Sequence, residues 1–529
     1  MPADRVTAWD PGIPGGIPGR SAVCATVDAL AYGEGALDAT AAIQAAIDAC
    51  PEGQVVSLSA GTFAITRSLL IGKGIVLRGK GPEQTLLESS GFNGAVIWMG
   101  PLFPHVLVSV DLAADGPKGA TSIAVADASG FAPGTLALID ELWDPRYVQW
   151  SATRSPPGDP SRGWFSRFDR PVGQMVEVRS VSGNTVTFTT PLHIAFETAQ
   201  KAQLSRFDRA AVRNAGLEDL RVHGGGNDNI ALALVAYNWV KNVESEWSTG
   251  DSIVIDNSFR SVVRDSYFHH SPELYPGGGA YGLSVSNSSA DNLIENNIFR
   301  HFNKVMVMRA SGGGNVVGYN YFEDGFIGST PLDYTQWMEV GMNASHMTCP
   351  HYELFEGNEA FNVDADNTWG NSVYVTFFRN HATGKRRSFP DVDNRRAIGL
   401  MAGSWWYTFV GNVLGYPGMS AVSYSSFRYE SALPWDPQPV PMWQLGYDPE
   451  DWKRAADPRV LSTVIREGNF DYATGQVHWS NRAYQLPDSL YLSGKPPFFG
   501  DDPWPWVDPT GTTRLHTLPA RARFEAMNP

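Results

Sequence analysis

The chain has 529 residues, among them 53 glycines and 36 prolines, and 12% of its residues are aromatic. This composition favours a turn-rich β protein, because helices tolerate glycine and proline poorly. The formal net charge of −15 argues against a nucleic acid as partner, since neutralising phosphates requires a surface rich in lysine and arginine. No run of about 18 apolar residues occurs, so we expect no membrane-spanning segment.

The start of the chain, MPADRVTAWDPG, lacks the apolar segment of a signal peptide. Of the three cysteines, Cys24 and Cys50 bracket the first predicted helix, and Cys349 stands far downstream. Cys24 and Cys50 are either a disulfide, as in an oxidising compartment, or two reduced and buried thiols. We expect a secreted, extracellular or periplasmic protein in its mature form. The cysteine spacings give no zinc signature.

The first predicted element is a short amphipathic helix over residues 38–50, which ends before Pro51. Short strands separated by glycine-centred turns follow over residues 54–87, as in a coil of a solenoid. Between residues 104 and 196 the pattern changes to alternating strands joined by Ser-Gly and Gly-Asn turns, which predicts an inserted antiparallel module. A loop rich in Pro, Arg and Trp interrupts this module at residues 143–171.

A variable motif recurs from residue 216 to residue 415: two apolar residues, two or three polar ones that often include Asn or Asp, then an aromatic or apolar residue. Examples are LIENNIF at 293–299, VVGYNYF at 316–322 and FVGNVLG at 409–415. The closest copies are about one β-helix coil apart, and wider gaps imply inserted loops. A leucine-rich repeat is the structural alternative, but its fixed leucine consensus is absent.

The run from Asp38 to Leu87, with its helix, a Gly-Thr-Phe coil and an apolar-Arg-Gly-x-Gly turn, resembles the opening of pectate-lyase-superfamily proteins. The resemblance implies an all-β, right-handed parallel β-helix and, usually, action on a polysaccharide. We expect a cap and first coils at 1–103, the inserted module at 104–196, the main β-helix at 197–428, and a final coil with an irregular aromatic tail at 429–529. The motifs of polygalacturonases and pectate lyases are not found, so no catalytic residue is carried over.

Asp364 and Asp366 are the preferred acid and base. On an extended strand they project from the same face about 6.5–7 Å apart, which suits an inverting glycosidase. Glu339 is the preferred third carboxylate, if it lies one coil earlier. The alternative is that both aspartates are turn formers that cap backbone amides.

Other side chains near these carboxylates suit a sugar polymer. Aromatic rings can stack on sugars, and arginine forks bind uronate carboxylates, although the arginines can also form a solvated ion-pair loop with Asp391 and Asp393. Only one ring of the Trp405–Trp406 doublet can face a ligand, because side chains alternate along a strand. The predicted substrate-binding residues are Trp369, Trp337, Trp405, Trp406, Arg387, Arg395, His346 and Tyr334.

His269 and His270 with Glu273 form a weak metal motif, because adjacent histidines lack the usual helical spacing. We therefore expect no metal and no cofactor, apart from calcium if the protein is a lyase.

The leading hypothesis is a secreted, polysaccharide-degrading glycoside hydrolase. The first alternative is a polysaccharide lyase that cleaves a uronate polymer by β-elimination, and the second is a noncatalytic carbohydrate-binding or tailspike-like protein. The sequence leaves the sugar and the oligomeric state open.

Overall fold

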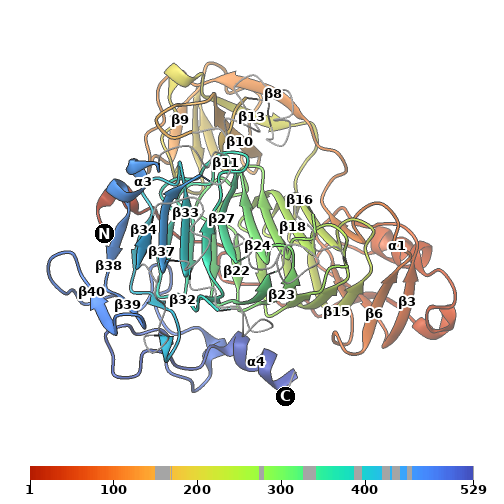
Figure 1. Ribbon diagram of the computed structural model, residues 1–529. Coiled ribbons are helices and arrows are strands. Elements are labelled where there is room, and N and C mark those ends of the chain that lie inside the picture. The colour runs from red at the N-terminus through yellow and green to blue at the C-terminus, as the bar shows by residue number, and fades with distance from the viewer. Residues whose placement is uncertain are drawn as a thin grey trace.

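A computed structural model describes the chain except residues 149–166, 168, 273–278, 326–340, 386–395, 420–428, 432–440, 449–455 and 528–529. Parallel strands stack coil upon coil into an elongated solenoid, with helix α1 (Thr40–Ala49) at one end (Figure 1). The predicted parallel β-helix, its capping helix and its inserted antiparallel module are thereby confirmed.

We call the wall that carries the candidate site sheet 1. Its strands pair in parallel in the order β4 (Leu69–Ile71), β7 (Ile97–Met99), β16 (Ile230–Ala236), β18 (Ile253–Phe259), β21 (Leu283–Ser286), β24 (Met306–Arg309), β27 (Met342–Met347), β30 (Val363–Ala365), β33 (Ile398–Met401), β37 (Trp443–Tyr447) and β36 (Glu430–Ser431), and β14 (Val212–Arg213) joins at β16.

The second wall, sheet 2, contains β1 (Val23–Val27), β2 (Val55–Leu58), β5 (Val76–Arg78), β19 (Val262–Arg264), β22 (Leu293–Glu295), β25 (Val316–Gly318), β28 (Leu354–Glu356), β31 (Thr376–Phe378), β34 (Thr408–Val410) and β38 (Ile465–Glu467). The third, sheet 3, contains β3 (Gly61–Ile65), β6 (Thr85–Ser89), β20 (Tyr267–His269), β23 (Ile298–Phe302), β26 (Tyr321–Gly325), β29 (Glu359–Ala360), β32 (His381–Ala382), β35 (Val413–Leu414), β39 (Asn469–Asp471) and β40 (Gln476–His478). The long strands β15 (Gly216–His223) and β17 (Trp239–Glu246) run through both walls.

The inserted module is an antiparallel sheet on one side of the solenoid (Figure 1). Its order is β8 (Val106–Asp111), β13 (Gln203–Phe207), β10 (Leu136–Glu141), β11 (Val172–Ser182), β12 (Thr185–Phe188) and β9 (Ser122–Ala124). Its last strand lies beyond residue 196, where the sequence pattern placed the end of the module. Within the residues that the structure describes, the other helical segments are η1 (Ala3–Arg5), η2 (Ala29–Gly35), η4 (Thr198–Gln200), α3 (Pro458–Thr463), η6 (Pro497–Phe499) and α4 (Pro519–Met527).

The repeated asparagine of the sequence motif forms a ladder inside the turn between sheets 2 and 3. The Oδ1 atom of Asn320 accepts from the backbone N–H and the side-chain amide of Asn297, at 2.9 and 3.0 Å. The same pair of bonds links each next member of the ladder, which continues through Asn358, Asn380, Asn412 and Asn469. Each rung thus satisfies buried backbone groups and fixes one coil over the next.

The residue before each ladder asparagine has positive φ, for example Tyr319 at 56° and Gly357 at 67°. This left-handed conformation costs a non-glycine residue free energy, so the ladder must hold it in place. Inside the solenoid, phenylalanines of successive coils stack as well, with ring centroids 4.8 Å apart for Phe268 and Phe299 and 5.2 Å apart for Phe299 and Phe322.

Both ends of the chain pack against the outside of the solenoid. Trp9 contacts the outer face of sheet 2 beside Val316 and Leu354. In the C-terminal tail, the Trp506 side chain is buried and donates to the carbonyl of Gly357. The tail contains η6 and α4, and its aromatic side chains pack on the outside of the solenoid, where they are shielded from water.

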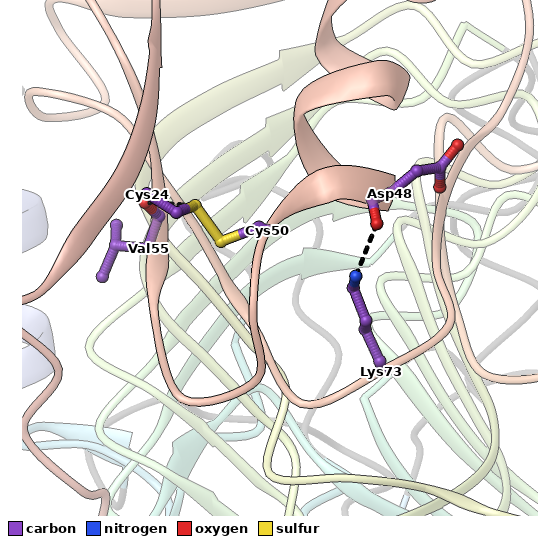
Figure 2. The surroundings of a disulfide bond; sticks show 5 residues. All are labelled: Cys24, Asp48, Cys50, Val55 and Lys73. Atoms are coloured by element: carbon purple, nitrogen blue, oxygen red, sulfur yellow. Dashed lines mark hydrogen bonds between the residues drawn. A yellow bond between two sulfur atoms is a disulfide. The ribbon is translucent and has the colours of Figure 1, made fainter.

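Cys24 of β1 and Cys50 at the end of α1 form a disulfide, with Cα atoms 5.5 Å apart (Figure 2). Lys73 donates to the carbonyl of Asp48 in the last turn of the same helix, which satisfies an otherwise unpaired helix end. A bridge that closes a loop of this length stabilises the fold by about 3 kcal/mol in the chain-entropy view. The capping helix is therefore held covalently to the first coil.

Replacing Asn358 with Ala tests the ladder. The variant removes the side-chain partner of the Asn320 N–H and of the Val317 carbonyl inside the core, and it leaves the side-chain oxygen of Asn380 with only the backbone N–H of residue 358. We expect a loss of roughly 3 kcal/mol or more of unfolding free energy, since each unsatisfied buried group costs about 1–3 kcal/mol. Denaturant unfolding measures it, with the exposed Asn481→Ala as control. Equal stability of the two variants would show that the ladder contributes nothing.

Candidate functional site

The candidate site lies on the outer face of sheet 1. Along β30, Val363 and Ala365 point into the core, so Asp364 and Asp366 point outward. Both aspartates are nevertheless buried, with exposed fractions of 0% and 1%. Buried carboxylates need compensating partners, and the two aspartates have different ones.

Asp364 belongs to a structural ion pair. Its Oδ1 lies 2.6 Å from the guanidinium of Arg396, which also donates to Gln444 and to the hydroxyl of Tyr447. All four side chains are buried. This network ties β30 to β37 and leaves Arg396 committed to protein contacts.

Asp366 anchors a relay that ends at a tyrosine hydroxyl. Its Oδ2 lies 2.8 Å from Nδ1 of His346, 3.1 Å from Nζ of Lys304 and 2.6 Å from Nδ2 of Asn343. On the far side of the ring, Nε2 of His346 lies 3.2 Å from the hydroxyl of Tyr281. The order Tyr281, His346, Asp366 is therefore a hydrogen-bonded chain through buried groups.

An irregularity in β27 positions His346. Val307 and Arg309 of β24 pair with Asn343 and Met347 of β27, so two extra residues are accommodated in β27. Such a bulge re-aims a side chain, and here it directs the imidazole of His346 toward the ring of Tyr281, with centroids 5.8 Å apart.

Electrostatics fix the protons of the relay. Burial alone would raise the pKa of Asp366, but the charge of Lys304 and the hydrogen bonds of His346 and Asn343 hold it well below its usual range. Burial lowers the pKa of His346 and outweighs the opposing effect of Asp366, so the ring is neutral at neutral pH. Because the carboxylate can only accept, Nδ1 carries the proton and Nε2 accepts from Tyr281.

Tyr281 belongs to a column of ionisable residues, one from each of four coils. Asp228, Asp251, Tyr281 and Lys304 each precede a strand of sheet 1 by two residues, and the strands they precede pair in register. Burial raises the pKa of the Tyr281 hydroxyl, while the positive charges of Lys304 and Arg309 oppose the shift. The column brings together side chains that lie far apart in the sequence.

The other end of the column is acidic. The backbone N–H of Asp251 donates to Asp228 at 2.8 Å, and the Asp251 carboxylate lies 3.7 Å from the guanidinium of Arg309. Burial and the charge of Asp251 raise the pKa of Asp228 to about 7, and burial raises that of nearby Asp256 to about 6. Arg309 keeps 28% of its side chain exposed, so this end of the cluster reaches solvent.

The comparisons with known proteins agree with this architecture. The family described as Rhamnogalacturonase A/epimerase, pectate lyase-like matches residues 25–102. The tailspike gp61 of Pseudomonas phage phi297 is 17% identical, with a TM-score of 0.51 over 71% of this chain and 57% of that one. The chain is a parallel β-helix protein, and its residues 25–102 match a pectate-lyase-like family.

An alginate lyase from Paenibacillus sp. str. FPU-7 is 10% identical, with a TM-score of 0.34 over 74% of this chain and 86% of the lyase. No curated protein matches the sequence. This β-helix protein spans little more than half the length of the phage tailspike that it resembles. The likeness establishes the fold, and function has to be argued from the site.

Of the residues predicted from the sequence, Asp366 and His346 lie in direct contact, and Asp364 lies on the same outer face. Asp366 also accepts from the backbone N–H of Thr368 at 3.0 Å, as the turn-former alternative predicts. An aspartate with a lowered pKa and a lysine partner does not suit the role of general acid. The remaining predicted residues, Glu339, Trp337, Tyr334, Arg387 and Arg395, lie outside the described residues.

The predicted tryptophan platforms are engaged by the protein itself. Arg459 lies 3.9 Å from the ring centre of Trp405 and 4.3 Å from that of Trp406. Trp405 also donates to Asp457, and Trp406 stacks on Tyr374 with centroids 4.7 Å apart. Trp369 is half-buried against the core. The Trp405–Trp406 doublet therefore has a packing role in the described structure.

Sequence reasoning missed Tyr281, Lys304, Arg309, Asp228 and Asp251. A usable signal existed, because Asp228 and Asp251 are 23 residues apart, as are Tyr281 and Lys304, and each precedes an apolar strand. This is also the separation of Asn297 and Asn320 in the ladder. Aligning coils on that period would have stacked Asp228 on Asp251 and Tyr281 on Lys304.

The raised pKa of Asp228 predicts a pH-dependent stability. Its folded pKa is about 7 against an ordinary 3.8, so between these values the folded state binds more protons and stability falls as pH rises. Replacing Asp228 with Asn removes this loss. We therefore expect the difference in unfolding temperature between the variant and wild type to shift in favour of the variant from pH 5 to pH 8.

Thermal unfolding at both pH values measures the effect, with the exposed Asp501→Asn as control. The assignment would be contradicted if the unfolding temperature of the variant fell relative to that of wild type as the pH rises.

Proposed function

We propose that this protein is a polysaccharide lyase that cleaves a uronate-containing polymer by β-elimination on the outer face of sheet 1. The observation that carries the proposal is the Tyr281–His346–Asp366 relay beside the partly exposed Arg309. The family that matches residues 25–102 and the fold of the phage tailspike support a polysaccharide as substrate. The Cys24–Cys50 disulfide supports the proposal that the protein acts outside the cytoplasm, because disulfides persist in oxidising compartments.

In this mechanism Arg309 pairs with the uronate carboxylate and thereby lowers the cost of forming a carbanion at C5. Tyr281 takes the C5 proton as its own hydroxyl proton passes to Nε2 of His346, whose other nitrogen stays bonded to Asp366. The C4–O4 bond breaks, a C4–C5 double bond forms, Tyr281 passes the proton taken from C5 to the departing O4, and His346 gives its proton back to Tyr281. Asp366 is a positioning residue that stabilises the imidazolium.

Positive charge favours this chemistry at Tyr281. Lys304 and Arg309 both oppose the rise of its pKa, so they stabilise the phenolate that the step requires. Arg309 lies 6.0 Å from the Tyr281 ring, within reach of a carboxylate bound over that ring. Calcium, which the lyase hypothesis allows, is not needed for these steps and stays a prediction.

Glycoside hydrolysis is the second candidate, supported by a different observation. Asp228, with its pKa raised to about 7, holds a proton near neutrality as a general acid must, and Asp251 lies beside it. This assignment differs from the one predicted with Asp364, Asp366 and Glu339. The two candidates share the outer face of sheet 1 and differ in their products.

The test is a screen of neutral and uronate-containing polysaccharides, in which reducing ends and the ultraviolet absorbance of an unsaturated uronate are both recorded. We expect both signals to rise together on a uronate polymer. Replacing Tyr281 with Phe removes the base, and we expect kcat to fall by about 10²-fold or more. The exposed Tyr484→Phe is the matched control.

Reducing ends without absorbance, abolished in an Asp228→Asn variant, would establish hydrolysis in place of elimination. Full activity of Tyr281→Phe would contradict the relay. Binding without turnover of any polymer would support the noncatalytic alternative.

A further inference from the structure

A second cluster of ionisable side chains lies on the outer face of sheet 3, near the capped end of the solenoid. In β15, β17 and β20, His223 pairs in register with Glu246, and Glu246 with His269. Glu244 precedes Glu246 by two residues, so both glutamates project from the same face. Three consecutive coils thus contribute imidazole and carboxylate groups to one spot.

The distances are short. Nε2 of His269 lies 3.1 Å from Oε1 of Glu244 and 3.8 Å from Oε2 of Glu246. One donor atom from each of these three residues can be chosen so that all lie within 4.8 Å of one another. His223 reaches Glu246 from the other side, with Nδ1 3.1 Å from Oε1 of that carboxylate, and its Nε2 lies 3.7 Å from Glu88. The side chains of the two histidines and of the two β17 glutamates are 9–31% exposed, close enough to the surface for an ion to enter.

The hydrogen bond behind His269 orients it as a ligand. Its Nδ1 lies 2.6 Å from Nδ1 of His270, so one ring donates to the other. When His269 donates, Nε2 is left to face two carboxylates that can only accept. A cation between these three atoms, either a proton or a metal ion, resolves the conflict. Metal-binding histidines commonly have such a hydrogen bond on the second ring nitrogen.

We propose that Glu244, Glu246 and His269 bind a divalent transition-metal ion, with His223 as the fourth ligand. Imidazole and carboxylate donors suit Zn²⁺, which binds them at about 2.0–2.2 Å. The ion joins β15, β17 and β20 and stabilises the coils next to the cap. The metal motif considered in the sequence paired His269 with Glu273, which lies outside the described residues. The structure brings His269 to two glutamates of the preceding coil.

One neighbouring charge opposes the ion. The guanidinium of Arg221 lies 3.8 Å from Glu244 and 3.7 Å from Glu246, and 34% of its side chain is exposed. Arg221 partly neutralises the two carboxylates and can turn toward solvent when an ion binds. Removing this charge therefore strengthens metal binding, whereas it would only weaken a cluster that serves as an ion-pair network.

The experiment uses the full chain without a purification tag, stripped of metal by a chelator. Zn²⁺ is titrated by calorimetry and Co²⁺ by visible absorption. We expect one ion per chain and a loss of affinity of at least tenfold in both Glu246→Gln and His269→Gln. The exposed His105→Gln and Glu525→Gln variants are the matched controls, with affinity equal to wild type.

Two further measurements distinguish a metal site from a protonated ion-pair cluster. Arg221→Gln is expected to bind Zn²⁺ several-fold more tightly than wild type, and Zn²⁺ is expected to raise the unfolding temperature of wild type but not of His269→Gln. Absence of one-to-one binding would overturn the proposal, as would equal affinity in the wild type and the two ligand variants.

Discussion

The hydrogen bonds between stacked asparagines are the constraint on which the rest of this structure depends. From Asn297 to Asn469, each side chain accepts from the backbone of the preceding coil and donates to its carbonyls, all inside the core. An apolar core alone would let one coil slip along the next, because phenylalanine stacks tolerate small shifts. A buried amide does not tolerate them, since a slipped rung leaves several polar groups unsatisfied. The ladder therefore fixes register as well as stability.

The fixed register between coils brings residues that are distant in the sequence together into one site. Asp228, Asp251, Tyr281 and Lys304 form a column only because their strands pair position for position. The same rule aligns His223, Glu246 and His269 on another wall. A departure from this regular pairing also contributes to the site. The bulge in β27 shifts the register between β24 and β27 and thereby directs His346 to Tyr281. The solenoid supplies regular spacing, and one local irregularity completes the relay.

The fold was predictable from the sequence because the motif asparagines and the apolar pairs before them recur along the chain, and because the capping helix shows its periodicity within one short window. Asp366 was found because it pairs with Asp364 on one face of a strand, and His346 because it lies in the polar insertion that precedes them. Tyr281 and Lys304 were missed because no motif marks them, and only the coil period connects them to Asp366. The packing of Trp405 and Trp406 depends on Arg459, more than 50 residues away on α3, which strand alternation cannot reveal.

The central claim is that coil register builds a polysaccharide site on the outer face of sheet 1. A crystal structure of the Tyr281→Phe variant with an oligosaccharide cut from its polymer tests this most directly. The account predicts a sugar carboxylate against Arg309 and a ring carbon next to the position of the missing Tyr281 hydroxyl. An oligosaccharide bound only on sheet 2 or sheet 3, with the Tyr281–His346–Asp366 cluster free of sugar, would contradict it.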